Sequence, residues 1–123
     1  MTRVLVVDDE TAIVDALEDI LSMEGYEVMS AFNGQEGLMR MSERTPDLVL
    51  LDLMMPVMSG AQLLGRIRQD PKLRDIPVVV MSAGRIAEEE RRNASAVLPK
   101  PFELDALLDT LARYLRPQAG QSP

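Results

Sequence analysis

Residues 48–60 read Leu-Val-Leu-Leu-Asp-Leu-Met-Met-Pro-Val-Met-Ser-Gly, an apolar run that stops at a single acidic residue, Asp52. A continuous apolar run of this length, without polar alternation, is typical of a parallel strand that is covered on both faces. Residues 4–7 and 78–81 have the same character. Together the three runs predict the central strands of one parallel sheet.

Segments with helical spacing separate these strands. The apolar residues of 13–21 recur at i, i+3, i+4 and i+7, as on one face of an amphipathic helix, and those of 104–115 nearly repeat this spacing. Weaker patterns predict strands at 27–31 and 96–98 and helices at 34–43, 60–69 and 88–92. Strict alternation of strands and helices requires right-handed crossovers and helices on both faces. We therefore expect an α/β fold with a single (βα)5 doubly wound parallel sheet.

The composition fits one globular domain and excludes several kinds of chemistry. The 123 residues contain no cysteine and no histidine, which leaves out disulfides, thiolate or imidazole metal sites and histidine-dependent triads. The 20 acidic and 13 basic residues give a net charge of -7, so we expect no direct nucleic acid or membrane binding. No apolar stretch has the length of a membrane span or a signal peptide, which favours a cytoplasmic protein.

Polar residues follow the predicted strands at the point where each strand ends. They are Asp8, Asp9, Asp52, Ser82 and Lys100. Because the carboxyl ends of parallel strands meet at one edge of a sheet, we expect these side chains to converge there. Single residues have structural explanations, since Asp9 suits a helix cap and Ser82 a turn. Three carboxylates, a hydroxyl and an ammonium group at one edge point instead to function.

Clustered carboxylates repel one another, so this group of residues calls for a cation. Oxygen ligands without imidazole or thiolate favour Mg²⁺. With the metal and Lys100 drawing charge, a carboxylate can attack phosphorus and form an aspartyl phosphate, to which Ser82 can donate a hydrogen bond.

Four runs, residues 4–10, 52–60, 82–83 and 98–102, resemble the motifs of the bacterial two-component response-regulator receiver domain. Their order and spacing also fit, with 44 positions from Asp8 to Asp52 and 30 from Asp52 to Ser82. The resemblance covers residues 2 to about 116 and implies a flavodoxin-like receiver fold. We expect a receiver domain at 1–117 and a disordered tail at 118–123, in a stand-alone protein or the excised input domain of a longer regulator.

The resemblance also implies a role for each site residue. Asp52 matches the phosphoacceptor, Asp8 and Asp9 match the acidic pair that holds Mg²⁺ with Asp52 and the backbone carbonyl of Met54, Lys100 matches the lysine on the phosphoryl group, and Ser82 matches the switch hydroxyl. The bond between Lys100 and Pro101 is usually cis in this family.

Two departures from the family pattern affect the expected output surface. Val97 stands where the family commonly has a rotating aromatic residue, so half of the usual switch is absent. The 18 positions from Ser82 to Lys100 are about four fewer than is common, which shortens the fourth helix by roughly one turn.

The leading hypothesis is a phosphorylation-dependent signalling switch, a monomer or weak dimer. A histidine kinase or histidine phosphotransfer protein supplies the phosphoryl group, and the modified domain changes its affinity for a target protein or a missing output domain. Its own catalysis is limited to self-phosphorylation and slow autodephosphorylation. The methionines of the loop after Asp52 are expected mainly to fill the core.

Two other functions fit the sequence less well. A Mg²⁺-dependent aspartyl-nucleophile phosphatase needs a second Asp two residues after the nucleophile, where this chain has Met54. A flavin-binding domain needs a phosphate loop after the first strand and aromatic residues around the flavin, but the first strand is followed by two acids.

Overall fold

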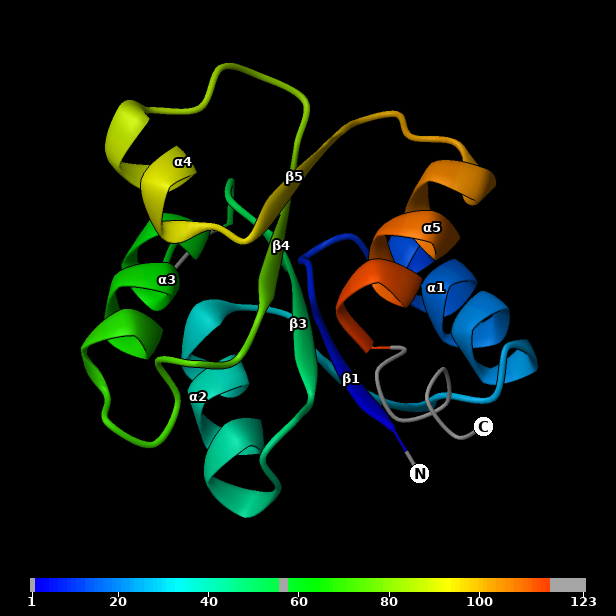
Figure 1. Cartoon of the computed structure of the whole chain (residues 1–123), viewed down its shortest axis with the longest axis horizontal. Helices are drawn as coiled ribbons and strands as arrows, with labels where there is room; N and C mark the ends of the chain where they lie inside the picture. Colours follow the sequence, from blue (N-terminus) through cyan, green and yellow to red (C-terminus); the bar gives the residue numbers. More distant parts are fainter. Residues whose placement is uncertain (1, 56–57, 116–123) are drawn as a thin grey trace.

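The computed structural model describes residues 2–55 and 58–115, so the predicted tail at 118–123 and the end of the predicted domain lie outside the described residues. Strands and helices alternate along the chain, as predicted (Figure 1). The strands are β1 (Arg3–Val7), β2 (Glu27–Ala31), β3 (Leu48–Asp52), β4 (Val78–Ser82) and β5 (Ala96–Pro99). The helices are α1 (Thr11–Met23), α2 (Gly34–Glu43), α3 (Gly60–Gln69), α4 (Glu88–Asn93) and α5 (Leu104–Leu115).

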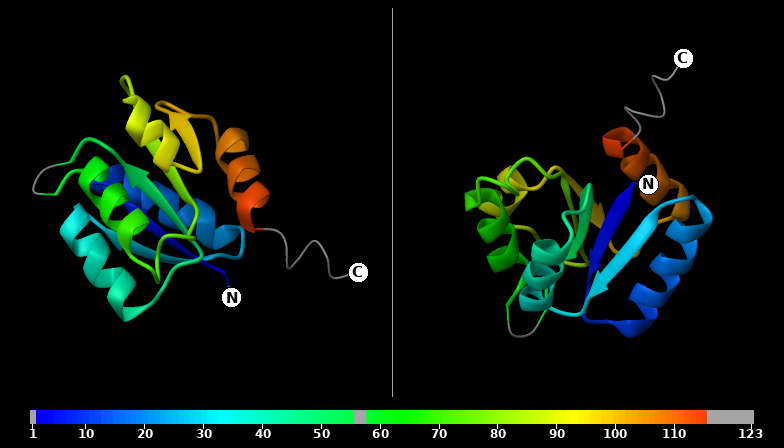
Figure 2. Two further views of the ribbon diagram at one scale, coloured as in Figure 1. Left: turned by 60° about the vertical axis from the view of Figure 1, so that its left-hand side comes forward. Right: turned by 90° about the horizontal axis from the view of Figure 1, so that it is seen from below.

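All five strands are parallel and form one sheet in the order β2-β1-β3-β4-β5. Helices α1 and α5 cover one face, and α2, α3 and α4 cover the other (Figures 1 and 2). The chain steps outward from β1 to β2 and then returns past β1 to β3. The order of the strands therefore reverses between β1 and β3, where such sheets place their functional groups.

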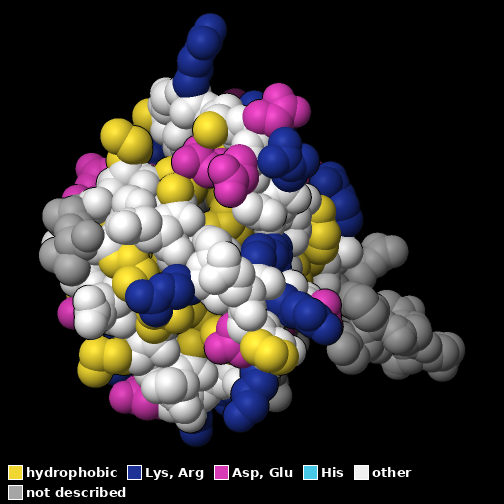
Figure 3. All heavy atoms as spheres, turned by 90° about the vertical axis from the view of Figure 1, so that its left-hand side faces the viewer, with side chains coloured by type: hydrophobic (Ala, Val, Ile, Leu, Met, Phe, Trp, Pro, Cys, Tyr) yellow, Lys and Arg dark blue, Asp and Glu magenta, His cyan; other side chains and the backbone are white. Residues whose placement is uncertain are grey.

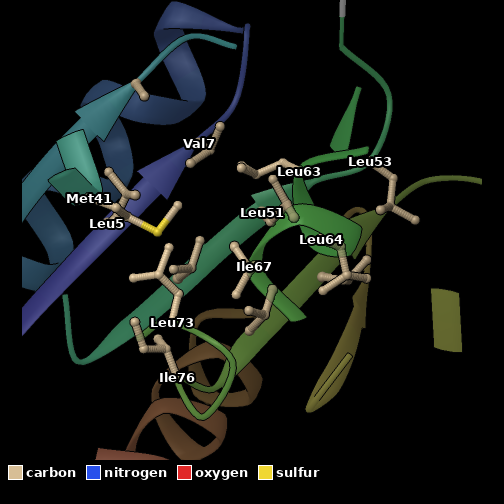
Figure 4. Packing of buried hydrophobic residues seen from close by; sticks show 14 residues of the cluster. Leu5, Val7, Met41, Leu51, Leu53, Leu63, Leu64, Ile67, Leu73 and Ile76 are labelled. Atoms are coloured by element: carbon tan, nitrogen blue, oxygen red, sulfur yellow. The ribbon is translucent and has the colours of Figure 1, made fainter. Parts of the chain in front are cut away.

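Two apolar clusters hold the layers together, one on each face of the sheet. Alternate strand residues point to opposite faces, so Leu5 and Leu51 join the cluster under α2 and α3, whereas Val4 and Leu50 join the cluster under α1 and α5. Figure 4 shows the first cluster, with Leu63 and the other labelled side chains gathered between sheet and helices. Each fully buried aliphatic side chain contributes about 1.5–3 kcal/mol.

Helix α4 is short, as predicted, and none of its six residues is buried. Hydrogen bonds anchor it instead of apolar packing. The Arg68 guanidinium on α3 donates from Nε to the carbonyl of Asn93 at 2.7 Å and from Nη1 to the carbonyls of Arg74 and Ile76 at 2.9 and 2.8 Å. The carboxyl end of α4 is thereby tied to α3 and to the approach to β4.

The surface over α2, α3 and α4 mixes acidic and basic side chains, with scattered hydrophobic atoms between them (Figure 3). Charges of both signs are thus interspersed on this face.

No helix in the described part of the chain combines the length and apolarity needed to cross a bilayer.

Glycine at position 60 is required by a close approach of two backbones beside Asp52. A Cβ atom there would collide with the carbonyl oxygen of Asp52 and lie 2.5 Å from Cα of Leu53. Gly65 on the same helix has nothing within 4 Å of such a Cβ. The two positions therefore respond to the same substitution in opposite ways.

We predict that Gly60→Ala lowers the free energy of unfolding by about 1–3 kcal/mol, because backbone atoms cannot move aside cheaply. Gly65→Ala, the matched control, should raise it by about 0.5–1 kcal/mol through helix propensity. Urea unfolding followed by circular dichroism measures both. Equal effects of the two substitutions would contradict this reading of the β3–α3 junction.

Candidate functional site

Three carboxylates meet at the carboxyl ends of β1 and β3. Asp8 follows β1 and is fully buried, Asp9 is exposed, and Asp52 closes β3 and is nearly buried. One carboxylate oxygen from each of the three lies within 4.8 Å of the others. The structure thus brings together the acidic residues that the sequence placed at one edge of the sheet.

Lys100 directly follows the carboxyl end of β5, and its side chain contacts this group of carboxylates. Its Nζ donates a hydrogen bond to Oδ2 of Asp8 at 3.0 Å and lies 3.5 Å from Oδ1 of Asp52. It also lies 3.6 Å from Oε1 of Glu10. The backbone N–H of Lys100 donates to the carbonyl of Ser82 at 2.8 Å, which fixes the root of the side chain to β4.

The charge of Lys100 follows from these contacts. Burial lowers the pKa of the ammonium group, but its hydrogen bond to Asp8 and the charges of Asp8, Asp52 and Glu10 together outweigh this effect and raise the pKa. The side chain is therefore a permanent cation at the site. The peptide bond between Lys100 and Pro101 is cis, as the family resemblance implied.

The surroundings of Asp52 disfavour a negative charge on its carboxylate. Burial, and then repulsion from Asp8, raises the pKa of its carboxyl above the ordinary value of 3.8. Lys100 and a backbone hydrogen bond from Met54 act in the opposite direction and do not compensate fully. A site in which a buried carboxylate is destabilised by its neighbours gains from any added cation.

Ser82 is the last residue of β4 and is buried beside this group. Its Oγ accepts a hydrogen bond from the backbone N–H of Gly84 at 3.2 Å, and it lies 3.4 Å from the carbonyl of Gly84. The turn suggested by the sequence is therefore present. Within the described residues, no hydrogen bond joins this hydroxyl to Asp52.

The structure does not support a capping role for Asp9. The N-cap of α1 is Glu10, and no side chain caps that helix. The backbone N–H of Glu10 donates instead to Oδ1 of Asp8 at 3.0 Å. The contact between Glu10 and Lys100 was not predicted from the sequence. The one signal for it was the position of Glu10 directly after Asp8 and Asp9.

The loop after Asp52 is less buried than expected. Met54 is 76% exposed, so the prediction that the loop methionines fill the core is wrong for this residue. Met55 and Met58 do pack against the apolar cluster under α3. The predicted metal contact of the Met54 carbonyl stays a prediction.

Two of the hollows lined by described residues border the site near Lys100 and Ser82. An apolar pocket of about 390 Å³ lies between α1 and the β5–α5 loop, and its lining includes Ile13, Ile20, Lys100 and Phe102. A second hollow of about 480 Å³ lies beside Ser82, Arg85, Ile86, Arg91 and Val97, among other residues. The second hollow contains the position where the family resemblance led us to expect an aromatic residue.

The raised pKa of Asp52 predicts a stability difference that depends on pH. A carboxyl whose pKa is higher in the folded state binds its proton more tightly there, so stability is highest below the ordinary pKa and is lost as the pH rises through the folded pKa. In metal-free buffer, Asp52→Asn should therefore stabilise the protein at neutral pH.

Urea unfolding with a chelator present, at pH 7 and near pH 4, measures this effect. The advantage of Asp52→Asn over the unmodified protein should shrink toward the lower pH. Asp109→Asn removes an exposed carboxylate from α5 and should show no such gain. A destabilised Asp52→Asn protein at pH 7 would contradict the electrostatic reading.

Comparisons with known proteins agree with this geometry. The family model of the response regulator receiver domain matches residues 4–112. The chain is 33% identical over 117 residues to sporulation initiation phosphotransferase F of Bacillus subtilis, covering 92% of this chain and 93% of that protein. It is 35% identical over 130 residues to the DNA-binding dual master transcriptional regulator RpaA of Synechocystis sp., covering 98% of this chain. The chain spans about half the length of RpaA, namely 54%.

Solved structures give the same result. Response regulator protein TrrA of Thermotoga maritima, in complex with Mg²⁺ and BeF, superposes with a TM-score of 0.85 at 35% identity, covering 94% of this chain and 100% of that chain. TrrA in complex with histidine kinase ThkA gives a TM-score of 0.83 at 35% identity, covering 94% of this chain and 99% of that chain. The chain therefore belongs to the response regulator receiver domain family, the phosphorylation-dependent signalling switches of two-component systems.

Proposed function

We propose that the domain accepts a phosphoryl group on Asp52 and that the modified site changes the affinity of the domain for a partner. The observation that carries this proposal is the position of Asp52 at the end of β3, close to Asp8 and Asp9 and 3.5 Å from the Lys100 ammonium. A carboxylate so placed has a nucleophilic oxygen and, in the Lys100 ammonium, one of the cations that a transferred phosphoryl group needs around it.

The acidic group fits Mg²⁺. Oxygens of Asp8, Asp9 and Asp52 lie within 4.8 Å of one another, and their mutual repulsion is relieved by a divalent cation. We propose that these three residues and the backbone carbonyl of Met54 hold it. The metal, when bound, neutralises charge on the phosphoryl oxygens as a Lewis acid.

The residues of the chain divide the remaining work. A carboxylate oxygen of Asp52 attacks phosphorus, the P–N bond of a phosphohistidine breaks, and the donor imidazole leaves with the bonding electrons. Lys100 offsets the negative charge of the group that has been transferred. Ser82 gives up its hydrogen bond with Gly84 and makes one to a phosphoryl oxygen. This exchange moves the start of the loop that leads from β4 to α4.

A histidine kinase or histidine phosphotransfer protein is the proposed donor. The apolar pocket between α1 and the β5–α5 loop includes Lys100 in its lining, so a partner seated there lies next to Asp52. Burying apolar atoms such as those of Ile13 and Ile20 gives the contact its affinity. The TrrA–ThkA complex supports this class of partner.

The domain acts as a switch and not as a turnover enzyme. We propose that its own chemistry is self-phosphorylation from a phosphodonor and slow autodephosphorylation. Met54, at the position where an aspartyl phosphatase carries its second acid, has no proton to give to a leaving group or to take from water. The partner that reads the switch is a target protein or an output domain joined to this one.

A Mg²⁺ titration followed by amide chemical shifts tests the metal site. We expect saturable binding at millimolar metal, and we expect Asp9→Asn to weaken it by roughly tenfold or more, because a direct ligand is lost. Asp19→Asn, which removes an exposed carboxylate from α1, should leave the affinity unchanged. If no Mg²⁺ binds, or if Asp9→Asn does not change the affinity for Mg²⁺, the proposed metal site is wrong.

Intact-protein mass spectrometry after incubation with acetyl phosphate tests the function itself. We expect one added phosphoryl group that requires Mg²⁺ and is lost in Asp52→Asn, because that carboxylate is the nucleophile. Asp75→Asn, an exposed acid elsewhere, should label like the unmodified protein. Labelling that persists in Asp52→Asn would move the acceptor to another residue and overturn the proposal.

A further inference from the structure

Three carboxylates compete for the ammonium group of Lys100. They belong to Asp8, Asp52 and Glu10, at 3.0, 3.5 and 3.6 Å. Asp8 and Asp52 are also members of the group of oxygens that fits a metal ion, whereas Glu10 is not. A cation bound to that group therefore weakens the hold of two of the three carboxylates on Lys100 and does not bind the third directly.

The position of Glu10 suits it to a contact that can be made and broken. Its backbone is fixed, because its N–H donates to Oδ1 of Asp8 and its carbonyl accepts from the first turn of α1. Its side chain is 62% exposed, unlike the fully buried side chain of Asp8. Releasing Lys100 from Glu10 therefore exposes the carboxylate to water at little cost.

The charges at the site show why this contact matters. Asp8, Asp9, Asp52 and Glu10 bring four negative charges, and Lys100 brings one positive charge. A divalent cation still leaves a net negative site, into which an anionic phosphoryl group must then fit. The group gains most when Lys100 turns fully toward it, and Glu10 draws the same ammonium toward α1.

We propose that Glu10 is a positioning residue that competes with the phosphoryl group for Lys100 and so lowers the affinity of the site for that group. The inference rests on the proposed function, because it assumes that a phosphoryl group is bound at Asp52. The backbone N–H of Glu10 is bonded to Asp8, but its side-chain carboxylate is not among the oxygens grouped for a metal ion, and it acts through the orientation of Lys100.

Beryllium fluoride, a phosphoryl mimic, tests the proposal as an equilibrium without catalysis. The full chain is titrated with beryllium fluoride at saturating Mg²⁺, and binding is followed by amide chemical shifts. Glu10→Gln should bind the mimic roughly two- to fivefold more tightly, the range expected for a partly exposed ion pair. Asp15→Asn, which removes an exposed carboxylate further along α1, should bind like the unmodified protein.

Two further variants separate the contact from a general effect of charge. Glu10→Asp keeps the charge but is one methylene shorter, so loss of the contact with Lys100 should also tighten binding. In a Lys100→Gln background, Glu10→Gln should have no effect, because the residue through which it acts is gone. If Glu10→Gln tightens binding but Glu10→Asp does not, or if the effect of Glu10→Gln survives in the Lys100→Gln background, the proposal is overturned in favour of simple repulsion.

The same titration distinguishes this inference from the function on which it rests. If the unmodified protein binds the mimic but Glu10→Gln leaves the affinity unchanged or weaker, the role of Glu10 is refuted and the phosphorylation site stands. If the unmodified protein fails to bind the mimic in the presence of Mg²⁺, the proposed function itself fails, and the role of Glu10 fails with it.

Discussion

The site depends on a sheet that holds like charges together. Oxygens of Asp8, Asp9 and Asp52 would separate if flexible segments carried them, but β1 and β3 pair in fixed register, with Val7 opposite Leu51. Residues 4–7 and 48–51 have no exposed surface, so moving the strands apart would cost far more than the repulsion that would be relieved. Apolar burial thus stabilises a polar arrangement that would not form alone.

Lys100 connects this electrostatic problem to the rest of the domain. Its ammonium group contacts the carboxylates of Asp8, which follows β1, and of Asp52, which ends β3, while its backbone N–H is bonded to the carbonyl of Ser82 at the end of β4. Burial, and then repulsion from Asp8, outweighs the attraction of this one cation and leaves Asp52 with a raised pKa. A change of charge at Asp52 therefore acts directly on a residue that is tied to β4 and β5.

The sequence predicted which strands form the sheet and which polar residues lie at its carboxyl edge. It predicted little about the direction and burial of the individual side chains. Continuous apolar runs located β1, β3 and β4, a weaker pattern located β5, and the polar residues at the strand ends located Asp52 and Lys100, because parallel strands must end at one edge. That Asp8 is buried while Asp9 is exposed depends on how the chain turns into α1. The contact of Glu10 with Lys100 depends on that same turn and on the path of a loop 90 positions away, which no local pattern records.

The contacts that hold α4 determine how easily the segment between the site and this helix can move. Arg68 fixes the carboxyl end of α4, but no residue of that helix is buried, and the hydrogen bond from the Ala87 N–H to Oε1 of Glu90 at its start stays within the helix itself. The segment between Ser82 and α4 can therefore move at a lower cost than a segment that leads into a buried helix. Because Val97 is small, the hollow of about 480 Å³ beside it gives that segment room. The position where the family resemblance led us to expect an aromatic side chain thus lines the same hollow as the start of the β4–α4 loop.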